Sequence, residues 1–292
     1  MSNYDLDGKV ILITGAAGGI GAATARALYA AGARLVLTDL RQADVDKLAV
    51  ELGDAASRQQ RLLAMALDVA DLAACKAAVA HAVEHFGRLD VVFANAGISW
   101  RAEPATMLSC DEAEFERIVA VDFLGVWRIV KAALPEIARH QGQVLVTSSI
   151  YAFMNGAVNA PYAASKAAIE MLARSLHAEL GSCGASAAVL YPGWVSTPIA
   201  RVAFGGHDLA TRMMEQGFPA PLRQPVPPER VASAVVRGLR KRQARIVVPG
   251  RWWPLLWLRG LLAPLMDGYL RRHRGIQPLM RELEQRQTAP RN

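Results

Sequence analysis

Short apolar runs alternate with longer amphipathic stretches through the first two thirds of the chain, and this alternation constrains the fold more than any other feature. The runs are rich in Val, Ile and Leu and have the length of buried strands; they span residues 10–13, 35–37, 62–67, 91–94, 144–146 and 187–190. The stretches have the length of helices and include residues 22–31, 72–86, 112–138 and 161–180. Regular alternation of strand and helix predicts an α/β fold, in which helices cover both faces of a parallel sheet.

The length and continuity of the chain indicate one folded unit with a carboxyl-terminal extension. Its 292 residues, 52% of them apolar, can bury a large core. No linker or low-complexity stretch interrupts the pattern. We therefore expect residues 1–250 to form one domain, followed by an extension over residues 251–292.

The cysteines and the amino terminus predict a protein of the reducing cytoplasm. The three cysteines, Cys75, Cys110 and Cys183, are odd in number and scattered, which argues against a disulfide framework and a zinc site. We expect no metal. Residues 1–9 contain no basic segment followed by an apolar run, so we expect no secretory signal there.

Positive charge is concentrated at the carboxyl end. Residues 230–292 contain fourteen Lys or Arg and three Asp or Glu, whereas the rest of the chain has a net charge of −4. Such asymmetry marks a nucleic-acid or membrane-surface patch in some proteins. No helix-turn-helix, zinc-finger or RNA-binding aromatic pattern accompanies it, so we do not expect a nucleic-acid partner.

An apolar block occupies the start of the extension, and a basic cluster follows it. The block consists of Trp252, Trp253, Leu255, Leu256, Trp257, Leu258, Leu261, Leu262, Leu265 and Met266, and the cluster of Arg271, Arg272, His273 and Arg274. The block is too short for a bilayer span, which needs about 20 apolar residues. Two interpretations stay open. The segment covers the substrate site or forms a subunit contact, which we favour, or it lies on a membrane surface, at the inner face of a membrane.

A glycine-rich turn links the first apolar run to the first amphipathic stretch. It reads Thr14-Gly15-Ala16-Ala17-Gly18-Gly19-Ile20-Gly21. Glycines between a strand and a helix let the backbone approach a pyrophosphate, which then lies at the positive end of the helix. The position of the turn therefore predicts a dinucleotide site.

Asp39 ends the second apolar run and bears on the choice of cofactor. A carboxylate there can accept hydrogen bonds from the adenosine ribose hydroxyls and would repel a 2′-phosphate, which favours NAD. Arg41 is near enough in sequence to receive a 2′-phosphate, so NADP is the alternative.

Tyr162 and Lys166 form a candidate acid/base pair. They are four residues apart in a predicted helix, so their side chains leave it on one face. A phenol has a pKa of about 10, and a neighbouring ammonium favours the phenolate and lowers that pKa. Such a pair can move a proton near neutral pH.

With these motifs the chain resembles the single-domain short-chain dehydrogenases/reductases, from about residue 8 to residue 250. The turn matches the family's TGxxxGIG motif, and Tyr162 and Lys166 match its catalytic pair. Ser149 lies 13 residues before Tyr162, at the family's catalytic Ser. Further matches are Asp68-Val69, Asn95-Ala96-Gly97, and Pro192-Gly193 followed by Thr197. The resemblance implies a Rossmann-type doubly wound sheet and, in most relatives, a dimer or tetramer.

The resemblance also implies a role for each residue. Tyr162 exchanges a proton with the substrate oxygen, Lys166 lowers the pKa of Tyr162 and binds the nicotinamide ribose, and Ser149 orients the substrate. The implied cofactor-binding residues are Gly15, Gly18, Gly19, Ile20, Gly21, Asp39, Asp68, Val69, Asn95, Gly97, Tyr162, Lys166, Pro192, Gly193 and Thr197. The implied reaction interconverts a hydroxyl and a carbonyl with NAD(P).

Asp122 departs from the family pattern. Relatives carry Asn in a VNxxG context, where this chain has Val121-Asp122-Phe123-Leu124-Gly125. In the family, the backbone carbonyl of that residue holds a water linked to the catalytic Lys. We count Asp122 among the catalytic residues, because an added carboxylate favours a charged Lys166.

Apolar side chains around the motifs predict a hydrophobic substrate, such as an aliphatic, aromatic or steroid-like alcohol or ketone. Residues 198–228 correspond to the mobile lid of relatives and contain Phe204, Met213, Met214 and Phe218. The other candidates for the pocket wall are Trp100, Tyr151, Phe153 and Trp194. The alternative functions are a cofactor-binding regulator and a membrane-associated scaffold. Neither would require Ser149, Tyr162 and Lys166 at the spacing of catalytic residues.

Overall fold

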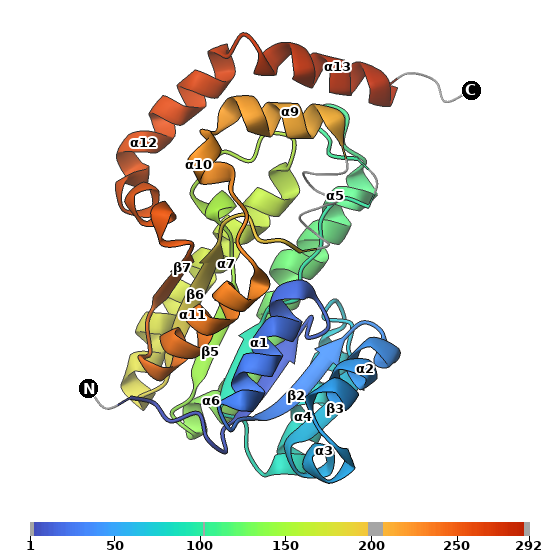
Figure 1. Ribbon diagram of the computed structural model, residues 1–292, viewed down its shortest axis with the longest axis vertical. Helices are drawn as coiled ribbons and strands as arrows, with labels where there is room; N and C mark the ends of the chain where they lie inside the picture. Colours follow the sequence, from blue (N-terminus) through green and yellow to red (C-terminus); the bar gives the residue numbers. More distant parts are fainter. Residues whose placement is uncertain (1–2, 102, 198–206, 289–292) are drawn as a thin grey trace.

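Seven parallel strands form one sheet in the order β3-β2-β1-β4-β5-β6-β7, so the strand order reverses beside β1 (Figure 1). The computed structural model describes residues 3–101, 103–197 and 207–288. The strands are β1 (Val10–Thr14), β2 (Arg34–Asp39), β3 (Leu62–Ala66), β4 (Val91–Ala94), β5 (Gln143–Thr147), β6 (Ser186–Pro192) and β7 (Arg245–Val248). The predicted parallel sheet is confirmed, and β7 adds a strand that the sequence analysis did not identify.

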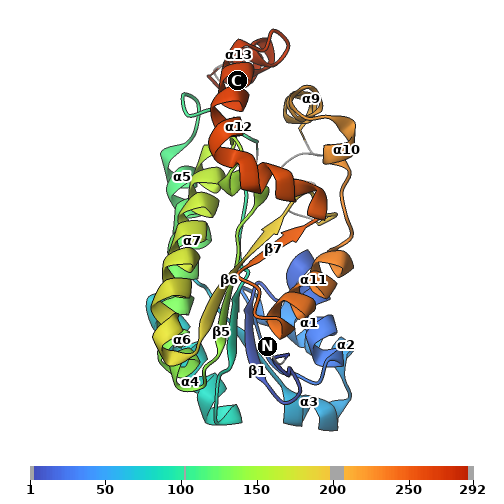
Figure 2. The same ribbon diagram turned by 90° about the vertical axis from the view of Figure 1, so that its left-hand side faces the viewer.

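Helices cover both faces of the sheet (Figure 2). One face carries α1 (Gly19–Ala30), α2 (Gln42–Leu52) and α11 (Pro228–Arg240), and the other carries α4 (Leu72–Phe86), α6 (Val126–Arg139) and α7 (Ala160–Glu179). Alternate residues of β1 therefore enter different cores: Leu12 packs in the cluster of Val79 and Ile129, and Ile13 in that of Leu28. Burial on both faces explains why the strands are continuous apolar runs.

Local capping defines the ends of several helices. The Asp71 side chain accepts hydrogen bonds from the N–H groups of Ala73 and Ala74 at the start of α4. Gly87 ends this helix with φ of 74°, a left-handed conformation that glycine adopts without strain. Asp54 caps the short helix α3 (Ala55–Arg61) through the N–H of Ser57.

The predicted helix over residues 112–138 is interrupted. It consists of α5 (Glu112–Val119), a π-helical segment η1 (Ala120–Gly125) and α6. A helix of this kind places one extra residue in a turn, and Asp122 lies inside it. A Cβ on Gly125 would lie 2.7 Å from Val69, so the π-helical segment packs closely against the residues that follow β3.

The carboxyl-terminal helices form a layer beyond the carboxyl ends of the strands (Figure 1). After β7 come η5 (Gly250–Trp252), α12 (Trp253–Arg272) and α13 (Ile276–Thr288), and these lie near α9 (Asp208–Gly217) and α10 (Ala220–Arg223). Leu279 and Leu283 of α13 pack on Leu209 and Met213 of α9. The division of the chain at residue 250 stays a prediction.

None of the helices in the described part of the chain has the length and apolar character that crossing a membrane requires.

Candidate active site

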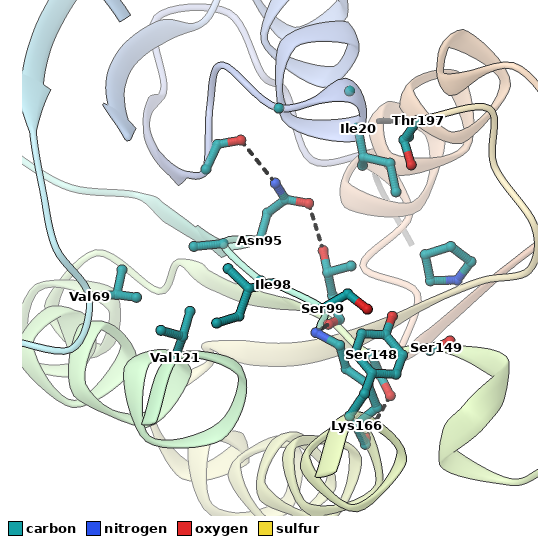
Figure 3. A pocket seen from close by; sticks show the side chains of 18 of the residues that line it. Ile20, Val69, Asn95, Ile98, Ser99, Val121, Ser148, Ser149, Lys166 and Thr197 are labelled. Carbon is teal, nitrogen blue, oxygen red and sulfur yellow. Dashed lines mark hydrogen bonds between the residues drawn. The ribbon is translucent and has the colours of Figure 1, made fainter. Parts of the chain in front are cut away.

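A cavity of about 570 Å³ opens at the carboxyl ends of the strands, where the strand order reverses (Figure 3). Open parallel sheets bind ligands at this place. The predicted site residues that line it are Gly15, Gly18, Gly19, Ile20, Asp39, Asp68, Val69, Asn95, Gly97, Ser149, Tyr162, Lys166, Pro192, Gly193 and Thr197. Gly21 and Asp122 are not among the lining residues. The structure thus brings together nearly all of the residues selected from the sequence.

The glycine turn needs its glycines for steric reasons. Gly15 has φ of +63°, and a Cβ there would lie 2.9 Å from the Cα of Ala96. A Cβ on Gly21 would overlap the carbonyl oxygen of Gly15. Because the turn is this tight, the amino terminus of α1 opens directly on the cavity, and its N–H groups suit an anion.

Asp39 is fixed at the edge of the glycine turn. Its carboxylate accepts hydrogen bonds from the N–H of Ala17 at 3.0 Å and of Leu40 at 2.8 Å. The exposed Arg41 pairs with Asp44 at 2.7 Å and does not line the cavity. Of these two side chains, Asp39 therefore faces the site and Arg41 does not.

Asn95 joins three strands beneath the cavity (Figure 3). Its Nδ2 donates to the carbonyls of Thr14 at 3.2 Å and Gly15 at 3.3 Å, and its Oδ1 accepts from the hydroxyl of Thr147 at 3.0 Å. The amide thereby links the glycine turn to the end of β5. Gly97 follows two residues later, and a Cβ there would lie 3.2 Å from Lys166 Nζ, so the glycine leaves room for the ammonium.

Tyr162, Lys166 and Ser149 lie on one wall of the cavity. Lys166 Nζ is 5.1 Å from the ring centroid of Tyr162 and donates to the carbonyl of Thr147 at 3.2 Å. Ser149 Oγ accepts from the N–H of Tyr151 at 3.2 Å, at the start of the short helix η2 (Ile150–Ala152). Ser149 thus caps this turn and also lines the cavity.

Burial opposes the predicted lowering of the Tyr162 pKa. Burial raises the pKa of Tyr162 above its usual value and is the largest effect, while the Lys166 ammonium and a hydrogen bond with Ser149 lower it. The negative charge of Asp122 raises it further. Lys166 thus lowers the pKa of Tyr162 as expected, but this effect is smaller than the increase that burial causes.

Asp122 contacts Lys166 directly behind the cavity wall. Its Oδ2 lies 3.3 Å from Lys166 Nζ, and its Oδ1 accepts the N–H of Ile98 at 2.7 Å. Both charged side chains are buried. Burial alone would lower the pKa of Lys166, but Asp122 and Tyr162 outweigh it and raise that pKa. Burial raises the pKa of Asp122, against the effects of Lys166 and the Ile98 N–H.

Some residues of the site were not identified from the sequence. Ser148 lines the cavity, and its hydroxyl donates to the carbonyl of Lys166 at 2.7 Å, which ties β5 to α7. Arg117 of α5 also lines the cavity and donates to the carbonyl of Ser99 at 2.9 Å. Ser148 could have been predicted as a site residue because it adjoins Ser149 in the sequence. No local sequence pattern distinguishes Arg117 from other arginines in helices.

A smaller cavity of about 50 Å³ shares Tyr151 and Asn159 with the main one. Its other walls are mostly apolar and include Trp100, Met213, Met214, Phe218, Leu270, Ile276 and Met280.

Among the predicted pocket residues, Tyr151 and Trp194 line the main cavity. Phe153 lines neither cavity and instead packs on Tyr191 in the core, with ring centroids 5.9 Å apart. Phe204 and residues 198–206 lie outside the described residues.

Comparison with known proteins finds close relatives over the same region. The family model for short chain dehydrogenases matches residues 9–218. Momilactone A synthase of Oryza sativa subsp. japonica is 38% identical, over 70% of this chain and 73% of the relative. Cis-4-hydroxycyclohexanecarboxylate dehydrogenase of Sinomonas cyclohexanicum is 35% identical, over 78% of this chain and 87% of the relative.

A solved structure shows the same arrangement of elements. The 3-ketoacyl-(acyl-carrier-protein) reductase from Brucella melitensis, complexed with NADH, has a TM-score of 0.70 and 26% identity. The match covers 84% of this chain and 99% of that chain. Sequence and structure agree, and the chain belongs to the short-chain dehydrogenase family.

Proposed function

We propose that this oxidoreductase interconverts a hydroxyl and a carbonyl group on a lipophilic small molecule, with NAD as its cofactor. One observation carries the proposal. Tyr162 and Lys166, one turn apart on α7, share a cavity wall with Ser149 where the strand order reverses. Open sheets bind dinucleotides there, and the glycine turn at the cavity is shaped for close backbone approach.

The chain supplies the proton chemistry. NAD, when bound, supplies or accepts the hydride. The Tyr162 hydroxyl protonates the carbonyl oxygen during reduction and accepts the proton during oxidation. Ser149 Oγ hydrogen-bonds the same oxygen and fixes its orientation. The Lys166 ammonium favours the tyrosinate, and Asp122 keeps Lys166 charged. Asp122 is therefore a positioning residue in this scheme.

The choice of NAD rests on Asp39. Its carboxylate is held by the glycine turn, where it can accept ribose hydroxyls and repel a 2′-phosphate. Arg41 is engaged with Asp44 outside the cavity lining.

We expect kcat/KM with NADH to exceed that with NADPH by about 100-fold, because a like-charge contact between a 2′-phosphate and the half-buried Asp39 carboxylate costs about 3 kcal/mol. Steady-state rates with each cofactor measure the ratio. Asp39→Ser is expected to bring it to within about tenfold, and Arg41→Ala is the matched control that leaves it unchanged. A preference of the wild type for NADPH would overturn the assignment.

The substrate class follows from the apolar walls of the two cavities. Trp194 lines the main cavity and Met214 and Phe218 the smaller one, and Trp194 packs on Phe218 with ring centroids 5.1 Å apart. One relative is named as a dehydrogenase of cis-4-hydroxycyclohexanecarboxylate, a ring alcohol that also carries a carboxylate. We therefore propose an aliphatic, aromatic or fused-ring alcohol or ketone, rather than a sugar.

The decisive experiment follows NADH absorbance with a panel of lipophilic ketones, and uses reducing sugars as the polar control. We expect turnover with cyclic ketones and none with the sugars. If NADH binds tightly and no compound is reduced, the cofactor-binding regulator is the better description.

Asp122→Asn tests the charged pair behind the site. With Lys166 still charged, neutralising the carboxylate removes a negative charge that raises the pKa of Tyr162, and so lowers that pKa. Alcohol oxidation requires the tyrosinate, so the acidic limb of its pH profile is expected to move to lower pH, with kcat at high pH retained within about tenfold. Glu112→Gln, which neutralises an exposed carboxylate on α5, is the control and should leave the pH profile unchanged. A loss as severe as that of Tyr162→Phe would contradict this role.

A further inference from the structure

Helix α12 runs along the outer edge of the protein, at the left in Figure 1 and across the front in Figure 2. Its inner face is anchored to the body. Arg259 donates to the buried carboxylate of Glu170 on α7 at 2.7 Å, and Asp267 accepts from Asn155 at 2.9 Å. Leu256 is buried on the same side. These contacts fix which side of the helix faces outward.

The outer face of α12 is a stripe of large apolar side chains. The exposed fractions are 72% for Trp257, 48% for Leu258, 74% for Leu261, 70% for Leu265 and 51% for Tyr269. Spacings of three and four residues place these side chains above one another on one face. Soluble proteins rarely leave such a continuous apolar patch without a partner. We refer to these five residues as the α12 stripe.

Positive charge adjoins the carboxyl end of the stripe. Arg271, Arg272 and Arg274 are exposed, and within the described parts of the chain none of them has a carboxylate within ion-pair distance. The one acidic residue of α12, Asp267, is bonded to Asn155. The stripe thus combines Trp and Tyr at its ends, leucines between them and arginines beside it.

We propose that the α12 stripe docks the protein on the surface of an anionic lipid bilayer. In this arrangement the helix lies in the membrane plane, the stripe enters the boundary between headgroups and acyl chains, and the arginines contact lipid phosphates. A second copy of the chain would cover the leucines, but its stripe offers no free carboxylate for Arg271 and Arg272. Charge complementarity therefore selects the anionic lipid. The docking does not depend on the redox chemistry.

Co-sedimentation of the full-length protein with vesicles tests the proposal. One vesicle contains phosphatidylcholine with phosphatidylglycerol, and the other phosphatidylcholine alone. We expect binding to the anionic vesicle that weakens as salt is added. Arg271→Gln with Arg272→Gln should reduce it by about 30-fold, since each charge contributes about 1 kcal/mol. Leu261→Glu with Leu265→Glu should abolish it.

Val50→Glu, at an exposed apolar position on α2, is the matched control and should bind as the wild type does. Circular dichroism and thermal unfolding establish that each variant is folded. Failure of the wild type to bind anionic vesicles would overturn the proposal, and so would undiminished binding by the double leucine variant. A wild-type dimer that the same leucine changes convert to monomers, without vesicle binding, would identify a second copy as the occupant instead.

Discussion

Replacing Tyr162 by Phe is expected to reduce kcat by about 10³-fold while the fold and the affinity for NADH are retained. The change removes one hydroxyl and leaves the ring, which packs edge-on to Tyr151 with centroids 6.1 Å apart. Loss of a positioned general acid costs between about 10² and 10⁴ in rate. Ser149 can still bind the substrate oxygen, but its hydroxyl lacks the ammonium that favours proton release from Tyr162.

Tyr151→Phe is the matched control for this prediction, because Tyr151 lines the same cavity. Burial raises the pKa of Tyr151 above its usual value, and the negative charge of an ionised Tyr162 raises it further. Its hydroxyl is therefore a poor proton donor, and we expect less than about a tenfold change in kcat. Steady-state kinetics and NADH titration measure both variants. Equal losses for the two tyrosines would remove the distinct role of Tyr162.

Lys166→Met is expected to destabilise the protein by about 3–5 kcal/mol and to abolish turnover. The Asp122 carboxylate is fully buried, and without Lys166 it keeps the hydrogen bond from Ile98 and the longer-range effect of Arg117, but loses its ion-pair partner. Removing one partner of a buried ion pair leaves an uncompensated charge with a cost of this size. Urea unfolding measures the free energy of unfolding of the variant and the wild type.

The destabilisation should depend on pH with a definite sign. Burial already raises the pKa of Asp122, and loss of the neighbouring ammonium raises it further. A carboxyl whose pKa is higher in the folded than in the unfolded state loses stability as the pH rises through that interval. Lys166→Met should therefore be less destabilised at pH 5 than at pH 8.

The double variant Lys166→Met, Asp122→Asn separates stability from catalysis. It removes both charges, so the unfolding free energy should recover by about 2 kcal/mol or more, whereas turnover stays lost. If Lys166→Met is as stable as the wild type at pH 8, the direct ion pair does not hold in solution. Recovery of turnover in the double variant would show that Lys166 has no part in catalysis.

Much of the sheet and the cofactor side of the site could be predicted from the sequence. Strands buried on both faces are continuous apolar runs, and Val91–Ala94 matches β4 in full. The polar motifs follow these runs directly, so parallel alignment brings Asn95 and Ser149 to one edge. The strand β7 was missed because Arg245–Val248 is short and begins with an exposed arginine.

Other features could not be predicted from the periodicity of apolar residues in the sequence. The run over residues 112–138 has one helical pattern, but η1 interrupts it at Asp122, and π-helical insertions have no distinct apolar period. Phe153 was expected at the pocket because it follows Ser149 closely. The intervening turn η2 directs it into the core instead.

Residue types and local patterns alone predicted the α/β class, the glycine turn and the shared helical face of Tyr162 and Lys166, because these depend on continuous apolar runs, on glycines that follow a strand and on the helical period of 3.6 residues. Two contacts became visible only in the folded protein: Asp122 touches Lys166, and Arg259 holds α12 with its stripe outward. Contacts between elements depend on how whole helices pack, and no local pattern specifies which side chains then meet.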